Sequence, residues 1–161
     1  MKTIFCTVCN LLYLRYGYRL LKSILENNPE FDSDFYFICD EPFSTGIQNG
    51  LKSVYKNVKF RYVEKDFYAA HGKSNPRFYS FCSFNLNADR VIFLDADMLC
   101  VGNINQLTSQ DFCGENFLFM VREQRMSTSF NAGLIVIPKM FLNSETFNAL
   151  VETDYSHVEL S

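Results

Sequence analysis

Short runs of consecutive apolar residues recur along the chain, and they constrain its fold more than any other feature. Residues 35–39 read FYFIC, residues 90–94 read RVIFL, and residues 117–121 read FLFMV. Each run is too short for a typical helix, which needs about ten residues or more. A strand that is apolar on both faces must also be covered on both faces, which is typical of parallel sheets packed between helices. These runs therefore predict buried strands.

Amphipathic segments lie between the apolar runs. Apolar residues at helical spacing predict a helix from about Tyr13 to Asn27, and Pro29 ends it because proline cannot continue a helix. A second helix is predicted to begin at Ser74-Asn75-Pro76, with proline in the first turn. A last helix is expected over about residues 144–152. Further strands are expected at residues 2–9, 57–63 and 133–137.

Residues 44–52 suggest a weak helix at best, and residues 64–75 a polar loop. The alternation of strands and helices predicts an α/β fold with a mainly parallel central sheet flanked by helices. The length of 161 residues suits a single domain over residues 1–161. In such sheets ligands bind beyond the carboxyl ends of the strands. That rule selects three places, which are residues 7–13, residues 95–97 and the loop before Leu134.

Composition and charge exclude several classes of function. The formal net charge is −3 and basic residues form no long run, so a nucleic-acid partner is not expected. No stretch approaches the roughly 18 apolar residues that span a membrane, so we expect no transmembrane segment. The apolar N-terminal run is interrupted by Asn10 and lacks the small-residue cleavage site of a signal peptide.

Six cysteines are present: Cys6, Cys9, Cys39, Cys82, Cys100 and Cys113. Cys6 and Cys9 have CxxC spacing, but no second pair follows that would complete a zinc site. A redox CxxC usually opens a helix, whereas this one lies in a predicted strand. We interpret the cysteines as structural thiols in a reducing compartment, and we predict a cytoplasmic protein.

Two aspartates directly follow the apolar run at residues 90–94. If the extended conformation persists, Asp95 and Asp97 point to the same side, because residues i and i+2 of a strand share a face. Two adjacent carboxylates repel each other unless a cation lies between them, and oxygen ligands suit Mg²⁺ or Mn²⁺. Such an ion can bridge to a diphosphate. The alternative is that one aspartate caps the next turn while the other is solvated.

Three further features are weaker. Asn131 and Gly133 precede an apolar strand, where glycine permits close approach of a ligand and asparagine offers a donor and an acceptor; the alternative is an ordinary turn. Tyr13 offers a flat face for a base or fills the core. Arg77, in the first turn of its helix, can reach a diphosphate or is simply solvated. No glycine-rich loop is present, which argues against a Rossmann dinucleotide site or a P-loop.

Taken in order, the segments TVCNLLYLRYGYRLLKSIL, DRVIFLDADMLCVGNI and FNAGLIVI resemble glycosyltransferase family 8, the glycogenin and galactosyltransferase-like group with a GT-A fold. The resemblance runs from about residue 3 to residue 138. Arg77 lies 18 residues before Asp95, about where the family carries a basic residue. The resemblance implies metal-dependent transfer of a hexose from a UDP-sugar to an acceptor hydroxyl, with retention of configuration. It leaves open whether the acceptor is a carbohydrate or a protein.

The resemblance also implies roles for individual residues. Asp95 and Asp97 would hold Mn²⁺ or Mg²⁺, Asp95 would also touch the ribose, and the Ala96 backbone would face the nucleotide. The residues that would line the uridine pocket are Thr7, Cys9, Asn10 and Tyr13, with Tyr13 stacking on the base. The residues that would lie near the donor sugar are Arg77, Asn131, Ala132 and Gly133.

The sequence also departs from the family pattern. A third metal ligand usually comes from a His near the C-terminus, in a segment with Gly and Lys. His71 is followed by Gly72 and Lys73 but lies upstream of the Asp pair, and His157 lacks the Gly and Lys. The family's Asp-Gln pair is missing too, and Asp154 is a poor substitute. We therefore expect a chain that lacks the family's C-terminal segment, and the alternative function is a catalytically incomplete nucleotide-sugar-binding domain.

A second enzyme class also places an Asp-x-Asp pair after an apolar strand. Phosphatases of the haloacid dehalogenase type usually carry it after the first strand, with Thr or Val two residues past the second aspartate. Here the pair comes late in the chain, and Leu99 occupies that position. The phosphatase interpretation is therefore disfavoured.

Overall fold

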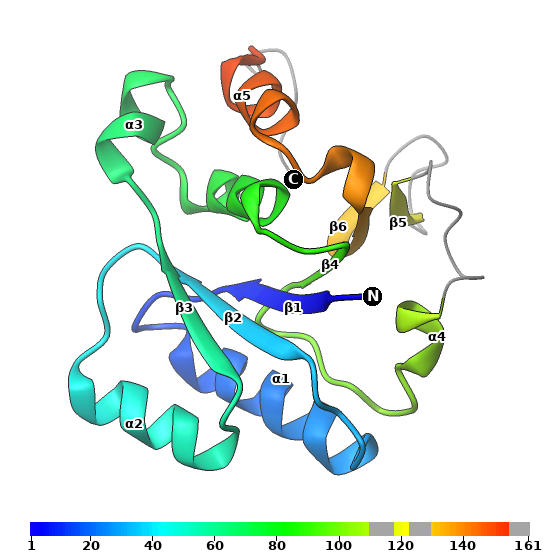
Figure 1. Ribbon diagram of the computed structural model, residues 1–161. Coiled ribbons are helices and arrows are strands. Elements are labelled where there is room, and N and C mark those ends of the chain that lie inside the picture. The colour runs from blue at the N-terminus through cyan, green and yellow to red at the C-terminus, as the bar shows by residue number, and fades with distance from the viewer. Residues whose placement is uncertain (110–117, 123–129, 155–161) are drawn as a thin grey trace.

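A central sheet of six strands organises the computed structural model, which describes residues 1–109, 118–122 and 130–154 (Figure 1). The strands are β1 (Thr3–Val8), β2 (Asp34–Cys39), β3 (Val58–Tyr62), β4 (Arg90–Leu94), β5 (Phe119–Arg122) and β6 (Phe130–Pro138). They are ordered β3-β2-β1-β4-β6-β5. The first four strands in this order are mutually parallel, and β6 runs antiparallel to both of its neighbours. The predicted α/β fold with a mainly parallel sheet is confirmed.

Helices cover both faces of the sheet. The α-helices are α1 (Leu14–Asn27), α2 (Thr45–Val54), α3 (Lys65–Ala70), α4 (Asn105–Thr108) and α5 (Ser144–Glu152), and the 3₁₀ helices are η1 (Pro76–Asn85) and η2 (Lys139–Phe141). In Figure 1, α1 and α2 lie below the sheet, whereas α3, η1 and α5 lie above it. The apolar side chains form two clusters that match these two layers.

Strand β4 shows why its sequence has no polar alternation. Val91 and Phe93 pack into the cluster beneath η1 and α5, while Ile92 and Leu94 pack into the cluster above α1. All five residues of the strand are buried, including Arg90, whose guanidinium donates to the backbone carbonyls of Leu107 and Ser109. Both faces of β4 are therefore core, and the first exposed side chain is that of the residue after it.

Two predictions about the intervening segments need correction. The predicted polar loop at residues 64–75 contains α3, because Phe67 and Tyr68 pack into the upper cluster and Tyr68 is 1% exposed. Two adjacent aromatics form no repeating apolar pattern, so no helical periodicity is visible in this segment. The weak helix at residues 44–52 is a regular helix at Thr45–Val54, and Ser44 caps it by accepting the N–H of Ile47.

The predicted starts of two helices, η1 and α5, are confirmed. The Asn75 side chain accepts the Arg77 N–H at 3.0 Å and caps a helix with proline in its first turn, although the helix is 3₁₀ and not α. Helix α5 begins at Ser144, where the Asn143 side chain accepts the Thr146 N–H at 2.8 Å. Short polar side chains thus satisfy the exposed N–H groups at both helix starts.

Four of the cysteines are buried free thiols, in agreement with a structural role: Cys6, Cys9, Cys39 and Cys82. Burial raises the pKa of the Cys9 thiol to about 12, so at neutral pH it is a neutral packing group. Cys113 lies outside the described residues. Within the described part of the chain, no helix has the length and apolar character needed to cross a bilayer.

Candidate functional site

The Asp95–Asp97 pair lies where β4 leaves the core. The Asp95 N–H donates to the carbonyl of Gly133 on β6 at 2.8 Å, and the Met98 N–H donates to the carbonyl of Asp95 at 3.2 Å. The chain therefore turns directly after the strand. Asp95 and Asp97 are exposed, whereas Ala96 between them is 8% exposed. The strand and the turn together present two carboxylates at one edge of the sheet.

The electrostatics of this pair favour a bound cation. Partial burial at the strand end raises the pKa of Asp95, and the negative charge of Asp97 raises it further. A divalent ion between the two carboxylates would remove that repulsion, and carboxylate oxygens are the ligands that Mg²⁺ and Mn²⁺ prefer. The donor set therefore fits such an ion. In the described ranges no third His, Cys, Asp or Glu joins the pair, so further ligands must come from elsewhere.

The end of β1 lies beside the end of β4, since the two strands are parallel and Cys6 pairs with Phe93. The turn that follows β1 is held by Asn10, whose side-chain and backbone oxygens both accept the Tyr13 N–H, at 3.0 and 3.1 Å. Tyr13 immediately precedes α1 and is 54% exposed. The turn that leads to Tyr13 and the turn that carries the carboxylate pair thus follow neighbouring strands at the same edge of the sheet.

Thr7 and Cys9 have side chains that are buried under α1 and are not part of the exposed edge. Thr7 is 0% exposed, and its hydroxyl has no hydrogen-bond partner within the described structure. The Cys9 sulfur lies close to α1, because a Cβ added at Gly17 would come within 3.1 Å of it. Contact of Thr7 and Cys9 with uridine stays a prediction. Both side chains lie in the core.

The segment with Asn131, Ala132 and Gly133 lies inside β6 and not in a turn before it, which corrects the boundary expected from the sequence. Strand β6 runs antiparallel to β4, with Leu134 paired to Leu94, so its beginning lies at the end of β4. That direction carries Gly133 to the Asp95 backbone. Ala132 is exposed, and the side chain of Asn131 lies outside what the structure describes.

The remaining predicted positions are divided between this edge and other places. Arg77 is exposed in the first turn of η1, on the layer above the sheet. His71 follows α3, and its Nδ1 lies 2.8 Å from the Phe67 carbonyl, so it belongs to the α3 turn and not to the carboxylate pair. His157 lies outside the described residues. Asp154 follows the end of α5 and, within the described residues, does not join the carboxylate pair in a metal-binding group.

An open hollow of about 530 Å³ lies further along the same edge, at the ends of β2 and β3, and contains neither Asp95 nor Asp97. Its charged residues include Asp40, Glu41 and Lys65, and the Lys65 ammonium lies 2.8 Å from the Glu41 carboxylate and 3.9 Å from that of Asp40. The aspartate pair and this hollow are therefore in different places, and we assign the site by the carboxylates.

One part of the site was missed by the sequence reasoning. Ser23 and Asn28, at the C-terminal end of α1, form hydrogen bonds to the backbone of residues 100–104, in the loop that follows the aspartates. In the sequence, Asn28 stands only between the predicted helix end at Asn27 and Pro29. No local pattern indicates that it bonds to a segment more than 70 residues away.

Comparison with known proteins identifies relatives of this arrangement. The model of the family described as Glycosyl transferase family 8 matches residues 5–150. A lipopolysaccharide 1,2-glucosyltransferase of Escherichia coli is 30% identical over 105 residues, which cover 59% of this chain and 31% of that protein.

Two solved structures share the fold. The apo form of glycosyltransferase GlyE from Streptococcus pneumoniae TIGR4 superposes with a TM-score of 0.74 at 21% identity, over 99% of this chain and 40% of that one. Galactosyltransferase LgtC in complex with donor and acceptor sugar analogs gives a TM-score of 0.68 at 18% identity, over 84% of this chain and 57% of that one. The chain thus spans less than two thirds of each of these relatives.

Proposed function

This chain belongs to glycosyl transferase family 8, and we propose that it binds a UDP-sugar together with Mn²⁺ or Mg²⁺ and transfers the hexose to an acceptor hydroxyl with retention. The proposal treats residues 1–161 as one donor-binding domain. The observation that carries it is the exposed carboxylate pair at the end of β4, next to the end of β1, whose following turn leads to the exposed Tyr13.

In this proposal Asp95 and Asp97 hold the metal ion, which would supply positive charge to the departing diphosphate. The raised pKa of Asp95 supports the assignment, because desolvation and then the charge of Asp97 disfavour its ionised form, and a cation bound beside it would offset both effects. The hydrogen bond from the Asp95 N–H to Gly133 fixes the start of the pair against the sheet. The Ala96 backbone, between the two carboxylates, faces the nucleotide.

Uridine would lie over the turn between β1 and α1. Tyr13 is exposed enough to stack on the base, and the Asn10 oxygens fix the backbone of that turn. Thr7 and Cys9 would line the uridine pocket from beneath this turn, where their side chains are buried. The donor sugar would lie near Asn131, Ala132 and Gly133, which belong to β6 and adjoin the metal pair. Arg77, from η1, would approach the sugar as well.

The second candidate is a domain that binds the nucleotide-sugar without turning it over. The observation that favours it is the two-carboxylate donor set, since no third protein ligand accompanies Asp95 and Asp97 within the described ranges. Binding and catalysis are then separable, because the diphosphate itself can complete the coordination of the ion.

Calorimetric titration of UDP, with and without Mn²⁺, tests the donor site. We expect micromolar binding that requires the metal ion. Absence of binding in both conditions contradicts the proposal and reduces the family relationship to one of fold. Incubation with UDP-glucose and UDP-galactose then separates the two candidates, because release of UDP indicates turnover, whereas binding without release indicates the incomplete domain.

A further inference from the structure

The loop that carries Asp97 is tied at a second point, at the C-terminal end of α1. After the turn at Met98, the chain runs beneath the core along α1, and the Cys100 N–H donates to the Ser23 hydroxyl at 2.9 Å. The Asn27 side chain donates to the Cys100 carbonyl at 3.0 Å. The two aspartates therefore lie on a short span between Gly133 of β6 and the C-terminal end of α1.

Asn28 is the most buried member of this second attachment, with 7% of its surface exposed. Its amide nitrogen lies 3.0 Å from the Ile24 carbonyl and 3.2 Å from the Gly102 carbonyl, and its oxygen accepts the Ile104 N–H at 2.9 Å. The same amide thus bonds to the last turn of α1 and to the loop. Only an amide supplies both donors and an acceptor at one position.

Helix α1 consequently links the two halves of the proposed site. Its N-terminal end follows Tyr13, which is assigned to the base, and its C-terminal end binds the loop that follows Asp97. Packing of Met98, Cys100 and Ile104 against the same lower cluster adds apolar contact to these hydrogen bonds. A shift of the loop relative to α1 changes the position of Asp97 relative to the nucleoside turn.

We propose that Asn28, with Ser23, is a positioning residue that holds the Asp95–Asp97 loop against α1 and so sets the affinity of the site for its metal ion. This inference rests on the proposed function. Neither residue contacts the metal ion or the substrate, and each acts through the backbone of residues 100–104. Removing groups that orient metal ligands from outside typically lowers metal affinity by about 10- to 100-fold.

The test compares Asn28→Ala with Asn57→Ala. Asn57 also donates its side-chain amide to a backbone carbonyl, that of Asp32 at 2.8 Å, but it bonds to no part of the loop after Asp97. Both variants lose a buried or half-buried amide contact, so both are expected to melt at a lower temperature. Mn²⁺ affinity is measured by electron paramagnetic resonance at saturating UDP, and UDP affinity at saturating Mn²⁺ is measured by calorimetry.

For Asn28→Ala we expect Mn²⁺ to bind about tenfold more weakly, with UDP affinity at saturating Mn²⁺ changed less than about twofold, and Asn57→Ala to retain wild-type Mn²⁺ affinity. If Asn28→Ala does not fold, Ser23→Ala removes the acceptor for the Cys100 N–H and should show the same pattern to a smaller extent. Unchanged Mn²⁺ affinity in a folded variant of either residue overturns the positioning role alone. Absence of Mn²⁺-dependent binding in the wild-type protein overturns the proposed function, and the positioning role with it.

Discussion

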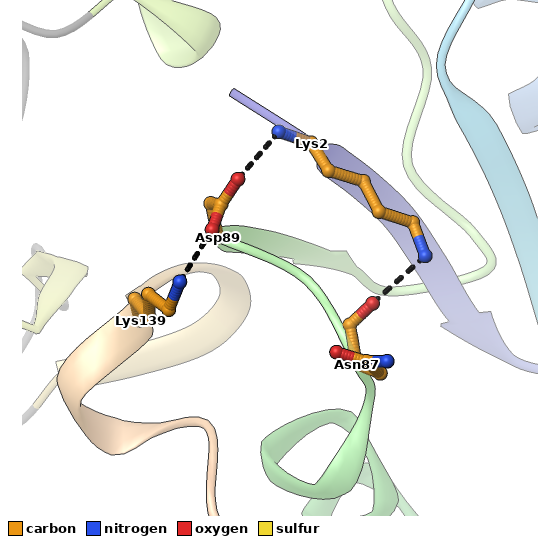
Figure 2. Close-up of polar contacts among 4 residues, drawn as sticks. All are labelled: Lys2, Asn87, Asp89 and Lys139. Atoms are coloured by element: carbon orange, nitrogen blue, oxygen red, sulfur yellow. Dashed lines mark hydrogen bonds and ion pairs between the residues drawn. The ribbon is translucent and has the colours of Figure 1, made fainter.

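The two ends of β4 each carry aspartates, and their surroundings are opposite. Before the strand, Asp89 accepts the backbone N–H of Lys2 at 2.8 Å and pairs with the Lys139 ammonium at 2.9 Å (Figure 2). These contacts hold the pKa of Asp89 below its usual range. After the strand, partial burial and the charge of Asp97 raise the pKa of Asp95, and no ion pair reaches either residue in the described ranges.

The contrast separates a structural carboxylate from one suited to a ligand. At the amino edge, the chain compensates the charge of Asp89 itself and uses it to join β1, β4 and η2 (Figure 2). At the carboxyl edge, two carboxylates lie together, an arrangement that favours a cation from outside the chain. Mutation of Asp97 is therefore expected to weaken metal binding with little effect on stability, whereas mutation of Asp89 is expected to affect stability and leave metal binding intact.

The largest effect is expected from Asp97→Asn. Loss of one metal-binding carboxylate should lower Mn²⁺ affinity by at least about 100-fold, with little change in melting temperature because the side chain is exposed. Calorimetry with UDP and Mn²⁺ measures the first effect, and thermal melting the second. The matched control is Asp89→Asn, which should leave Mn²⁺-dependent binding intact. Equal affinity in the Asp97 variant and the wild type would remove the metal assignment.

Tyr13→Ala tests the nucleoside half of the carboxyl edge. Stacking of a base on an aromatic ring contributes about 1–3 kcal/mol, so UDP should bind roughly 5- to 150-fold more weakly. Stability should change little, because Tyr13 is 54% exposed. Leu12→Ala, next to it and 80% exposed, is the control for disturbance of the turn. A collapse of the melting temperature in the Tyr13 variant would instead identify it as a core aromatic.

Gly17→Ala tests how closely α1 must approach the end of β1. The added Cβ would come within 2.9 Å of the Phe37 ring and 3.1 Å of the Cys9 sulfur. Overpacking costs about 1–3 kcal/mol, partly offset by about 1 kcal/mol of helix propensity, so we expect a net loss of about 1 kcal/mol in unfolding free energy. Gly50→Ala in α2, whose Cβ would meet nothing within 4 Å, should stabilise instead. Urea denaturation compares them, and equal stabilisation would contradict the close contact.

The smallest effect concerns pH at the amino edge. Because the pKa of Asp89 is lowered in the folded protein, its contribution to stability is present above the unfolded value of about 3.9 and is lost as pH falls through the lower folded value. Wild type should therefore melt slightly above Asp89→Asn near neutral pH, and the two melting curves should converge in acid. The difference should also shrink in salt, since the contacts are exposed. A difference that persists at low pH would show a non-electrostatic cause.

Local patterns predicted much of the fold. The apolar runs at residues 35–39 and 90–94 became buried strands, Asn75-Pro76 began a helix, and the last helix lies at the predicted residues 144–152. The run at residues 117–121 was expected to be buried as well, but it leads into the edge strand β5, where Leu118 just before the strand is exposed and Phe119 and Met120 are half-buried, because an edge strand has a neighbour on one side alone. These features depend on side-chain periodicity and capping chemistry, which short segments express by themselves. Helix α3 was missed because Phe67 and Tyr68 stabilise it through packing with other segments, which no window of local sequence contains.

The candidate site divides in the same way. The sequence alone determined that Asp95 and Asp97 follow a fully apolar strand and that an aromatic begins the first helix, and the family relationship follows from those segments. Only the tertiary structure decided that β6 runs antiparallel to β4, which brings Gly133 to Asp95, and that Asn28 binds the loop after Asp97. The reason is physical: periodicity and capping act within one turn or one strand, whereas strand direction and long-range hydrogen bonds depend on which segments pack together.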